Sequence, residues 1–424
     1  MLQTPYIREN KEEVIQKLLK KNYDAKDIIE LICQKDDLRK ETQSQLDDVL
    51  AQSNQLSKEI GLLFKNGQAD KAQEAKKQTA NLKEKSKSLG TTLQQLQHDL
   101  QDLLTQIPNV PHESVPSGNS ADDNEVTQEK GTIPNLGDTA MPHWELAKKY
   151  DLIDFELGNK ITGAGFPVYK GQGAKLQRAL INYFLDKNTS AGYQEVQVPH
   201  MVNEASGFGT GQLPDKEGQM YHITEDNLYL IPTAEVPITN IFRDVIVDAS
   251  DFPIQYTGYT PCFRREAGSY GKDVRGLNRL HQFDKVEIVQ IQDPKKSYQS
   301  LNDMVQHVSR LLDELELPYR ILKLCGGDMS FTSALTFDME VFSAAQKRWL
   351  EVSSISNFES YQANRLKLRY KDQNKKSVLC HTLNGSALAL PRIVAALLEN
   401  NQDKKGISIP KVLHPYTGFK RIEL

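Results

Sequence analysis

The chain is poor in cysteine, and the few cysteines it has are widely separated. No Cys-x-x-Cys pair and no His-Glu-x-x-His run occurs among its 424 residues, so the ligand spacing of a structural zinc site is missing and we expect no zinc. Separated cysteines are instead typical of reduced thiols in a reducing compartment. The four cysteines are Cys33, Cys262, Cys325 and Cys380.

Long apolar runs are also missing from the sequence. No stretch approaches the roughly 20 apolar residues that span a bilayer, and the N-terminal residues lead into charged ones without the apolar core of a signal peptide. These absences predict a cytoplasmic protein with no membrane partner. The formal net charge of -4 gives no general attraction for nucleic acid, so such a partner would need a local basic patch.

Proline is missing from residues 28–104, where apolar residues recur at alternating spacings of three and four. This spacing predicts two long helices packed as a left-handed coiled coil. A turn at residues 65–68 separates the two repeats, so we expect an antiparallel hairpin over 28–104 within an N-terminal domain of residues 1–107. The expected seam residues are Leu46, Val49, Ser53, Leu56, Ile60 and Leu63, then Leu82, Ser86, Leu89, Leu93, Leu96, Leu100 and Leu103.

The second helix of this hairpin carries a run of lysines. Such a run is usually a solvated face, and a helical hairpin can serve simply as a dimerisation rod. The alternative is an arm that reaches an extended nucleic acid, whose phosphates the lysines would contact. The lysines are Lys71, Lys76, Lys77, Lys83, Lys85 and Lys87.

A change in composition marks a second domain. Residues 108–140 are rich in proline and polar residues and are typical of a linker, so we place the second domain at residues 141–424. Strand-like runs at hairpin-length separations favour an antiparallel sheet flanked by helices, which predicts an α+β protein. Residues 177–199 predict a helix, a turn and a strand that ends at Pro199. The other expected strands are residues 228–231, 283–291, 319–324 and 337–341, and the other expected helices are residues 296–315 and 392–399.

Residues 263–287 carry the most specific pattern in the chain. They predict two strands joined by a polar, glycine-containing loop. Arg264 and Glu266 would share one face of the first strand, and Phe283 would share one face of the second with Glu287. An arginine fork binds phosphate or carboxylate, a carboxylate can accept from an exocyclic amine, and a phenylalanine can stack on a purine. The combination predicts a cleft for a nucleoside triphosphate and a small zwitterion.

Polar residues follow two other strand-like segments. Thr233 and Glu235 come directly after residues 228–231 and are placed to bind an ammonium or hydroxyl group. The simpler interpretation is a helix cap by Thr233 with Glu235 in the first turn. Glu351 and the serines after it, including Ser354, offer hard oxygen ligands for Mg²⁺, and the alternative is an exposed serine-rich edge strand.

Residues 383–392 predict a crossing from a strand or turn into a helix. Gly385 permits a close backbone approach, and Pro391 suits the first turn of a helix. Arg392 beside a helix N-terminus is disfavoured by the helix dipole. It becomes favourable when an anion such as a terminal phosphate completes the site.

These residues together resemble the seryl-tRNA synthetases of the common, non-zinc type, which are class II aminoacyl-tRNA synthetases. The similarity covers nearly the whole chain. The segment that ends at Pro199 is similar to the first class II motif, residues 264–287 to the second, and residues 385–392 to the third. The serine-specific similarity lies in residues 233–235, 263–271, 281–287, 351–357 and 384–386.

The resemblance implies a ligase that activates L-serine with ATP and transfers it to tRNA-Ser, with tRNA-Sec as a further candidate substrate. It also implies a homodimer, Mg²⁺ bound with ATP, and a hairpin arm that grips tRNA through the six lysines. Arg264 would contact the α-phosphate and the serine carboxylate, and Arg392 the γ-phosphate, so both are expected to be catalytic. The implied ATP-binding residues are Arg264, Arg265, Glu266, Phe283, Glu351, Val352, Ser353, Ser354 and Arg392, of which Glu351 and Ser354 would hold Mg²⁺. The implied serine-binding residues are Thr233, Ala234, Glu235, Arg264, Glu287, Asn384 and Ser386.

Three other interpretations compete with this one. An amino-acid:carrier-protein ligase would keep the adenylating domain but lack the helical hairpin. A non-catalytic scaffold would have lost residues such as Arg264 and Arg392, which are intact here. A threonine-specific enzyme would need a more open pocket and usually a metal, for which the cysteine and histidine spacings give no sign.

Overall fold

The computed structural model describes residues 1–137, 140–266 and 275–424. The chain divides into two compact units. The first consists of Met1–Leu19 and Tyr23–Pro108, and the second of Lys20–Asn22 and Asn109–Leu424.

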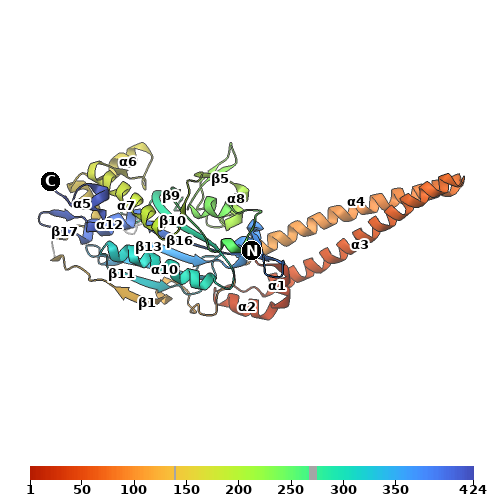
Figure 1. The fold of residues 1–424 in the computed structure, drawn as a ribbon, viewed down its shortest axis with the longest axis horizontal. Coiled ribbons are helices and arrows are strands. Elements are labelled where there is room, and N and C mark those ends of the chain that lie inside the picture. The colour runs from red at the N-terminus through yellow and green to blue at the C-terminus, as the bar shows by residue number, and fades with distance from the viewer. Residues whose placement is uncertain (138–139, 267–274) are drawn as a thin grey trace. The chain divides into compact units, whose positions relative to one another are not determined.

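The first unit is a helical hairpin preceded by two short helices. In Figure 1, α3 (Lys26–Lys65) and α4 (Ala69–Gln106) run side by side in opposite directions. Gly67 lies in the turn between them with a φ of 73°, a left-handed conformation that glycine adopts without steric cost. The predicted coiled-coil hairpin is therefore confirmed. The short helices are α1 (Thr4–Glu9) and α2 (Lys11–Leu19).

The seam of the hairpin follows the predicted repeat, and every expected seam residue is buried or partly buried. Val49 and Leu93 are among the buried ones. Close to the turn, however, α4 buries the small residues Ala72, Ala75 and Thr79 instead of leucines. Thr79 donates its hydroxyl to Ala75 O at 2.8 Å, so it can lie in the seam without an unpaired polar group. A search for large apolar residues overlooks this part of the seam.

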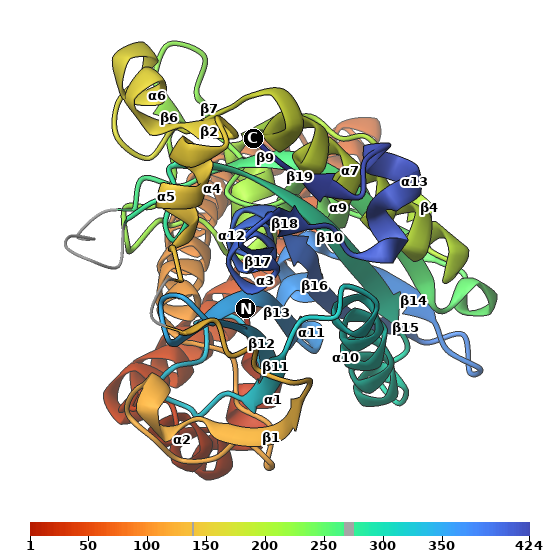
Figure 2. The same cartoon turned by 90° about the vertical axis from the view of Figure 1, so that its left-hand side faces the viewer.

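The second unit is built on one eight-stranded sheet (Figures 1 and 2). Its strands are β1 (Glu125–Lys130), β4 (Gln194–Glu195), β9 (Ile254–Phe263), β10 (Gln282–Gln292), β11 (Tyr319–Lys323), β12 (Leu335–Ser343), β13 (Arg348–Asn357) and β16 (His381–Ala389). Their order is β1-β11-β12-β13-β16-β10-β9-β4, and all neighbours are antiparallel except β4 and β9. The predicted α+β class with an antiparallel sheet is confirmed.

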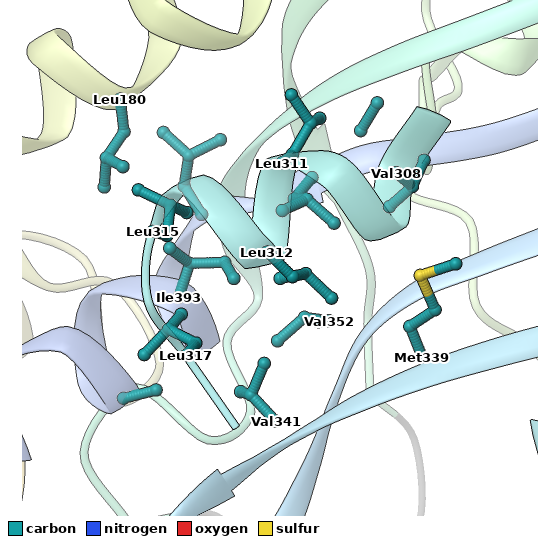
Figure 3. Close-up of a cluster of buried hydrophobic side chains, with 14 of the residues drawn as sticks. Leu180, Val308, Leu311, Leu312, Leu315, Leu317, Met339, Val341, Val352 and Ile393 are labelled. Carbon is teal, nitrogen blue, oxygen red and sulfur yellow. The ribbon is translucent and has the colours of Figure 1, made fainter. Parts of the chain in front are cut away.

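Three long helices pack together on one face of this sheet (Figure 2), namely α7 (Gly171–Ser190), α10 (Ser297–Glu314) and α12 (Leu390–Asn400). Figure 3 shows Leu180, Leu312 and Ile393 of these helices converging in one cluster. Val341 of β12 and Val352 of β13 meet them from the sheet. Because side chains alternate between the faces of a strand, the polar residues of the central strands gather on the opposite face.

Smaller elements complete the second unit. The remaining helices are α5 (His143–Lys149), α6 (Phe155–Ile161), α8 (Glu204–Thr210), α9 (Glu235–Asn240), α11 (Ser360–Leu366) and α13 (His414–Thr417), with 3₁₀ turns η1 (Ala121–Asp123), η3 (Ala249–Asp251) and η5 (Lys411–Leu413). The remaining strands are β2 (Ile153–Asp154), β3 (Val168–Tyr169), β5 (Met201–Asn203), β6 (His222–Ile223), β7 (Leu228–Leu230), β8 (Ile246–Val247), β14 (Arg369–Lys371), β15 (Ser377–Leu379), β17 (Gln402–Asp403), β18 (Gly406–Ser408) and β19 (Arg421–Ile422). Among the helices of the described residues, none has the length and apolar character that crossing a bilayer requires.

Residues 108–140, predicted as a linker, are partly built into the sheet. β1 pairs with β11 as an antiparallel edge strand, although all six of its residues are exposed. An exposed edge strand is held by its backbone hydrogen bonds and carries polar side chains, so its composition resembles that of a linker. The strand predicted to end at Pro199 is also shorter than expected, since β4 contains two residues.

Replacing Leu312 by alanine should lower the free energy of unfolding of the second unit by about 2–5 kcal/mol, because the substitution leaves a cavity in the core. Ile161→Ala is the matched control, since Ile161 is 67% exposed. The control should change that free energy by less than about 0.5 kcal/mol. Urea denaturation followed by tryptophan fluorescence measures both, because Trp144 and Trp349 belong to the second unit. Equal effects of the two substitutions would contradict the core assignment.

Candidate active site

Side chains along β10 alternate between the two faces of the sheet, and this alternation produces a polar face. Val286 and Ile288 point into the helix-covered core, so Glu287 between them points to the other face. On the neighbouring strand β16, Ser386 is the register partner of Glu287. Both residues are buried. Strand pairing therefore brings these two predicted serine-binding residues together.

Glu287 is surrounded by partners from its own chain. Lys285, two positions earlier on β10, places Nζ 2.7 Å from Glu287 Oε2. Thr233 donates its hydroxyl to the same oxygen at 3.2 Å, and Thr233 Oγ1 accepts the backbone N–H of Glu235 at 3.2 Å. The threonine thus makes a local turn contact and also reaches the buried carboxylate. Ala234 beside it is fully buried in a small apolar cluster. Lys285 was not predicted, although a charged residue inside an apolar strand was the available signal.

Glu235 lies in the first turn of α9, and its carboxyl group is buried. Gln362 of α11 donates Nε2 to Glu235 Oε1 at 2.6 Å. Burial raises the pKa of Glu235 to about 7, and repulsion by Glu287 acts in the same direction. Hydrogen bonds from Gln362 and Asn384 oppose this rise without cancelling it. Asn384, another predicted serine-binding residue, is therefore part of the same cluster.

Arg264 follows the last residue of β9, so the prediction that it lies on the strand is wrong. Its backbone N–H still donates to His281 O at 2.9 Å, which keeps it beside the start of β10. The side chain donates Nε to Pro232 O at 3.3 Å, and its guanidinium lies 5.2 Å from the centroid of the Phe283 ring. Arg264 therefore contacts both the segment that carries Thr233 and the ring of Phe283, which is predicted to stack on a purine.

Glu266 also lies beyond the strand, and its φ of 49° turns the chain out of the extended conformation. It consequently does not share a strand face with Arg264. The predicted shared face required the strand to continue to Glu266, and β9 ends at Phe263. Glu266 forms an ion pair with Arg279, while Arg265 is exposed. The polar loop that the sequence predicts next, with its family similarity up to residue 271, lies outside the described residues.

Arg392 stands in the first turn of α12, directly after Pro391, as predicted. Its Nη1 donates to Glu351 O at 2.8 Å and lies 3.6 Å from Glu351 Oε2. Its Nε donates to Asn278 O at 3.1 Å. The side chains of Arg392 and Glu351 remain partly exposed, so both can meet a ligand from solvent.

Strands β12 and β13 add an acidic residue that sequence reasoning missed. Asp338 is the register partner of Ser354. Burial raises the pKa of Asp338 well above its ordinary value, and the charge of Glu351 adds to the rise. Its Oδ1 is buried and has no hydrogen-bond partner within the described part of the chain. The alternation of apolar and acidic residues over 337–341 was the signal that could have revealed it, since it places the carboxylates on one face of a strand.

The other two predicted ATP ligands on β13 turn their side chains elsewhere. Val352 packs in the core beneath the helices, and Ser353 donates its hydroxyl to Ser386 O at 2.6 Å. Neither side chain therefore faces the cluster formed by Glu351, Ser354 and Asp338.

Metal ligation from protein groups alone is not supported. In residues 1–137, 140–266 and 275–424, no group of three or more His, Cys, Asp or Glu side chains is placed to hold a metal ion. A hard cation at Glu351 and Ser354 would need phosphate oxygens to complete its coordination, as Mg²⁺ in nucleotide sites does. The buried, unpaired oxygen of Asp338 fits a cation in this neighbourhood.

The six lysines predicted to contact RNA are all exposed on α4. Lys76 lies over the Phe64 ring, with Nζ 4.7 Å from the centroid. The six exposed lysines form a solvated basic face, and their ammonium groups are accessible to a ligand from solvent.

Comparisons with known families cover most of the chain. Residues 220–401 match the tRNA synthetase class II core domain (G, H, P, S and T), and residues 1–111 match the seryl-tRNA synthetase N-terminal domain. The fold and the polar cluster therefore define a class II aminoacyl-tRNA synthetase.

Individual relatives narrow this class to one family. The serine–tRNA ligase of Salinibacter ruber is 50% identical over 100% of this chain and 99% of its own length, and that of Prosthecochloris aestuarii is 46% identical with the same coverage. The crystal structure of seryl-tRNA synthetase from Pyrococcus horikoshii complexed with ATP matches with a TM-score of 0.92, at 31% identity over 100% of this chain and 99% of that one. The chain belongs to the seryl-tRNA synthetase family, as predicted, and is an aminoacyl-tRNA ligase.

The buried Glu235 should make stability depend on pH. Folding raises its pKa from 4.5 to about 7, so its carboxyl group favours folding when protonated and progressively loses that contribution as pH rises through this window. Replacing Glu235 by glutamine removes the titration. Relative to wild type, the variant should gain on the order of 3 kcal/mol in unfolding free energy between pH 4.5 and 7.

Urea denaturation at several pH values measures this gain. Glu195→Gln, at an exposed glutamate, is the control and should show no such window. A difference between Glu235→Gln and wild type that stays constant with pH would contradict the assignment.

Proposed function

We propose that this chain is a serine–tRNA ligase. It activates L-serine with ATP to give seryl-adenylate and pyrophosphate, and it then transfers serine to the 3′ end of tRNA-Ser with release of AMP. The observation that carries the proposal is the buried cluster of Thr233, Glu235 and Glu287 beside Arg264. Two acids, a hydroxyl and an arginine suit a small amino acid with a hydroxyl side chain. Family membership supports the same activity, since the relatives from Salinibacter and Prosthecochloris are named serine–tRNA ligases.

The charges in the cluster suggest how serine lies. Glu287 is already paired with Lys285 at 2.7 Å, so its negative charge is balanced before a ligand arrives. Glu235 has only uncharged hydrogen-bond partners among the described residues and a raised pKa, so a ligand ammonium would balance it. The ammonium of serine therefore binds near Glu235, and the serine hydroxyl binds between Glu287 and Ser386. A pocket built for a hydroxyl leaves buried groups unpaired with alanine, which can lower the rate by up to roughly 10⁴-fold.

ATP binds along the open edge of this cluster. Arg264 contacts the α-phosphate and the serine carboxylate, and Arg392 contacts the γ-phosphate. Phe283 and Glu266 hold adenine, for which Glu266 exchanges its ion pair with Arg279 for contacts with the base. Glu351 and Ser354 would hold Mg²⁺ together with phosphate oxygens, and the bound cation would screen the negative charge of the phosphates.

The chain's own residues then act by placement and charge. The serine carboxylate is a weak nucleophile that the triphosphate repels, and Arg264 lowers that repulsion while it fixes both groups in line. The bond between the α- and β-phosphates breaks as the bond to the carboxylate oxygen forms, and Arg392 stabilises the departing pyrophosphate. No protein nucleophile is required.

The first unit supplies the contact with tRNA. The N-terminal domain, residues 1–107, contains a hairpin arm over residues 28–104, whose exposed lysines on α4 bind the phosphates of tRNA-Ser, with tRNA-Sec as a second candidate. The match of residues 1–111 to the seryl-tRNA synthetase N-terminal domain supports this role. A homodimer in the cytoplasm, with Mg²⁺ as the metal and no zinc, completes the proposal.

Arg264→Ala should lower serine-dependent exchange of pyrophosphate into ATP by at least about 100-fold, because no other cation of the described cluster can neutralise both substrates. The control is Arg310→Ala, which removes an exposed arginine on α10 and should leave exchange near the wild-type rate. Near-normal exchange in Arg264→Ala would remove this residue from its assigned role.

Changing all six arm lysines to glutamine should leave pyrophosphate exchange intact and strongly reduce charging of tRNA-Ser. The logarithm of tRNA affinity should also depend less steeply on the logarithm of salt concentration, by roughly one unit of slope for each phosphate that the arm no longer binds. The control changes Lys404 and Lys405, two exposed lysines of the second unit, to glutamine. Charging that survives the six substitutions would show that these lysines do not grip the RNA.

A further inference from the structure

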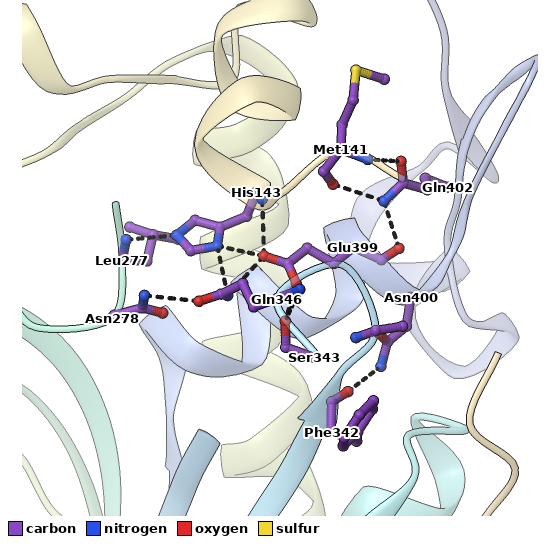
Figure 4. A network of polar contacts seen from close by, with 11 residues as sticks. Met141, His143, Leu277, Asn278, Phe342, Ser343, Gln346, Glu399, Asn400 and Gln402 are labelled. Carbon is purple, nitrogen blue, oxygen red and sulfur yellow. Dashed lines mark hydrogen bonds and ion pairs between the residues drawn. The ribbon is translucent and has the colours of Figure 1, made fainter. Parts of the chain in front are cut away.

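A buried histidine lies outside the residues assigned to the reaction. His143 and Glu399 are both fully buried, and His143 Nδ1 lies 2.7 Å from Glu399 Oε1 (Figure 4). The backbone N–H of Leu277 donates to His143 Nε2 at 2.8 Å, so Nε2 carries no proton. The proton must then be on Nδ1, which donates to Glu399. The carboxylate thus fixes one tautomer of the ring.

Glu399 is itself held in the charged form. Burial would raise its pKa, but hydrogen bonds from His143 and Ser343 lower it overall. Gln346 also donates Nε2 to Glu399 Oε1 at 2.9 Å. Figure 4 shows these side chains converging on the carboxylate from two segments of the chain, the start of α5 and the end of β12 with the turn that leads to β13. The imidazole therefore has a rigid support on its Nδ1 side.

On its other side, the imidazole supports the turn that precedes β10. A Cβ atom on Gly276 would lie 2.2 Å from His143 Nε2, so the backbone of the turn rests directly on the ring. Asn278 donates Nδ2 to Gln346 Oε1 at 2.9 Å. The guanidinium of Arg275 lies 4.7 Å from the ring centroid of Trp144, the neighbour of His143. The turn is thus fixed at several points by the His143 network.

The same turn contacts two residues of the proposed ATP site, Arg392 and Glu266. Asn278 O accepts Arg392 Nε at 3.1 Å. The next residue, Arg279, forms the ion pair with Glu266. A shift of this turn would therefore move the proposed γ-phosphate ligand and the proposed adenine ligand together.

We infer that His143, held by Glu399, is a positioning residue for ATP: through the N–H of Leu277 it sets the turn that orients Arg392. This inference rests on the proposed role of Arg392 in binding ATP. His143 touches neither the serine cluster nor the reacting atoms. Substitutions of His143 should consequently change KM for ATP and leave KM for serine unchanged.

Two substitutions at His143 separate its two contacts. Asparagine can donate to Glu399 from the position of Nδ1, but it is too short to accept from the N–H of Leu277. Glutamine can place an oxygen where Nε2 lies and keep that acceptor. His143→Asn should raise KM for ATP in serine-dependent pyrophosphate exchange by about tenfold and leave KM for serine unchanged, because a buried N–H loses its partner. His143→Gln should stay closer to wild type. Equal rises of the two KM values, or equal effects of the two variants, would overturn the inference.

A double-mutant cycle tests the route through Arg392. Adding His143→Asn to Arg392→Ala should raise KM for ATP by a clearly smaller factor than His143→Asn does in the wild type, whereas fully additive effects would show that His143 does not act on this arginine. The wild type and Arg392→Ala alone test the proposed function separately, since the first must show exchange and the second a raised KM for ATP.

Gln346→Ala provides the measurement if His143→Asn does not fold, because Gln346 is only partly buried and links Asn278 to the same network. It should raise KM for ATP selectively, by a smaller factor than Arg392→Ala. An unchanged KM for ATP in this variant would overturn the inference.

Discussion

The alternation of side chains along β10 and β16 is the constraint on which the rest of the second unit depends. Val286 and Ile288 must face the helices to form the core, and this forces Glu287 onto the opposite face. Ser386 follows because it is the register partner of Glu287. A shift of one residue in the register would exchange the two faces, so the packing of the core and the position of the polar cluster cannot vary independently.

The second constraint is the balance of charge at the buried acidic residues, some of which have a cationic partner while others have none among the described residues. Glu287 has Lys285 as a buried partner, whereas Glu235 and Asp338 are buried with no cation of the described residues paired to them, and their pKa values rise as a result. A positively charged ligand group is the natural partner for each of them. Arg392, a partly exposed arginine of the site, shows the reverse preference, because it stands in the first turn of a helix where an anion is favoured.

The sequence predicted the residue types of the site better than their local conformation. Arg264 and Glu266 were recognised as a pair, but the strand ends before them and a positive φ at Glu266 breaks the assumed alternation. Lys285 and Asp338 were missed because a charged residue on a strand is usually exposed, and only the fold shows that Lys285 and a carboxyl oxygen of Asp338 are buried and which residues lie beside them. The edge strand β1 was missed because backbone pairing leaves no pattern in exposed polar residues.

The sequence by itself determined the two-part organisation, the coiled-coil hairpin and the family, because heptad spacing and short motifs are local properties of the chain. Only the tertiary structure decided which polar side chains are paired with one another. The contacts of Glu235 with Gln362, and of His143 with Glu399, join residues more than 100 positions apart. Such contacts are set by how helices and strands pack, and packing is a property of the whole fold that no local spacing encodes.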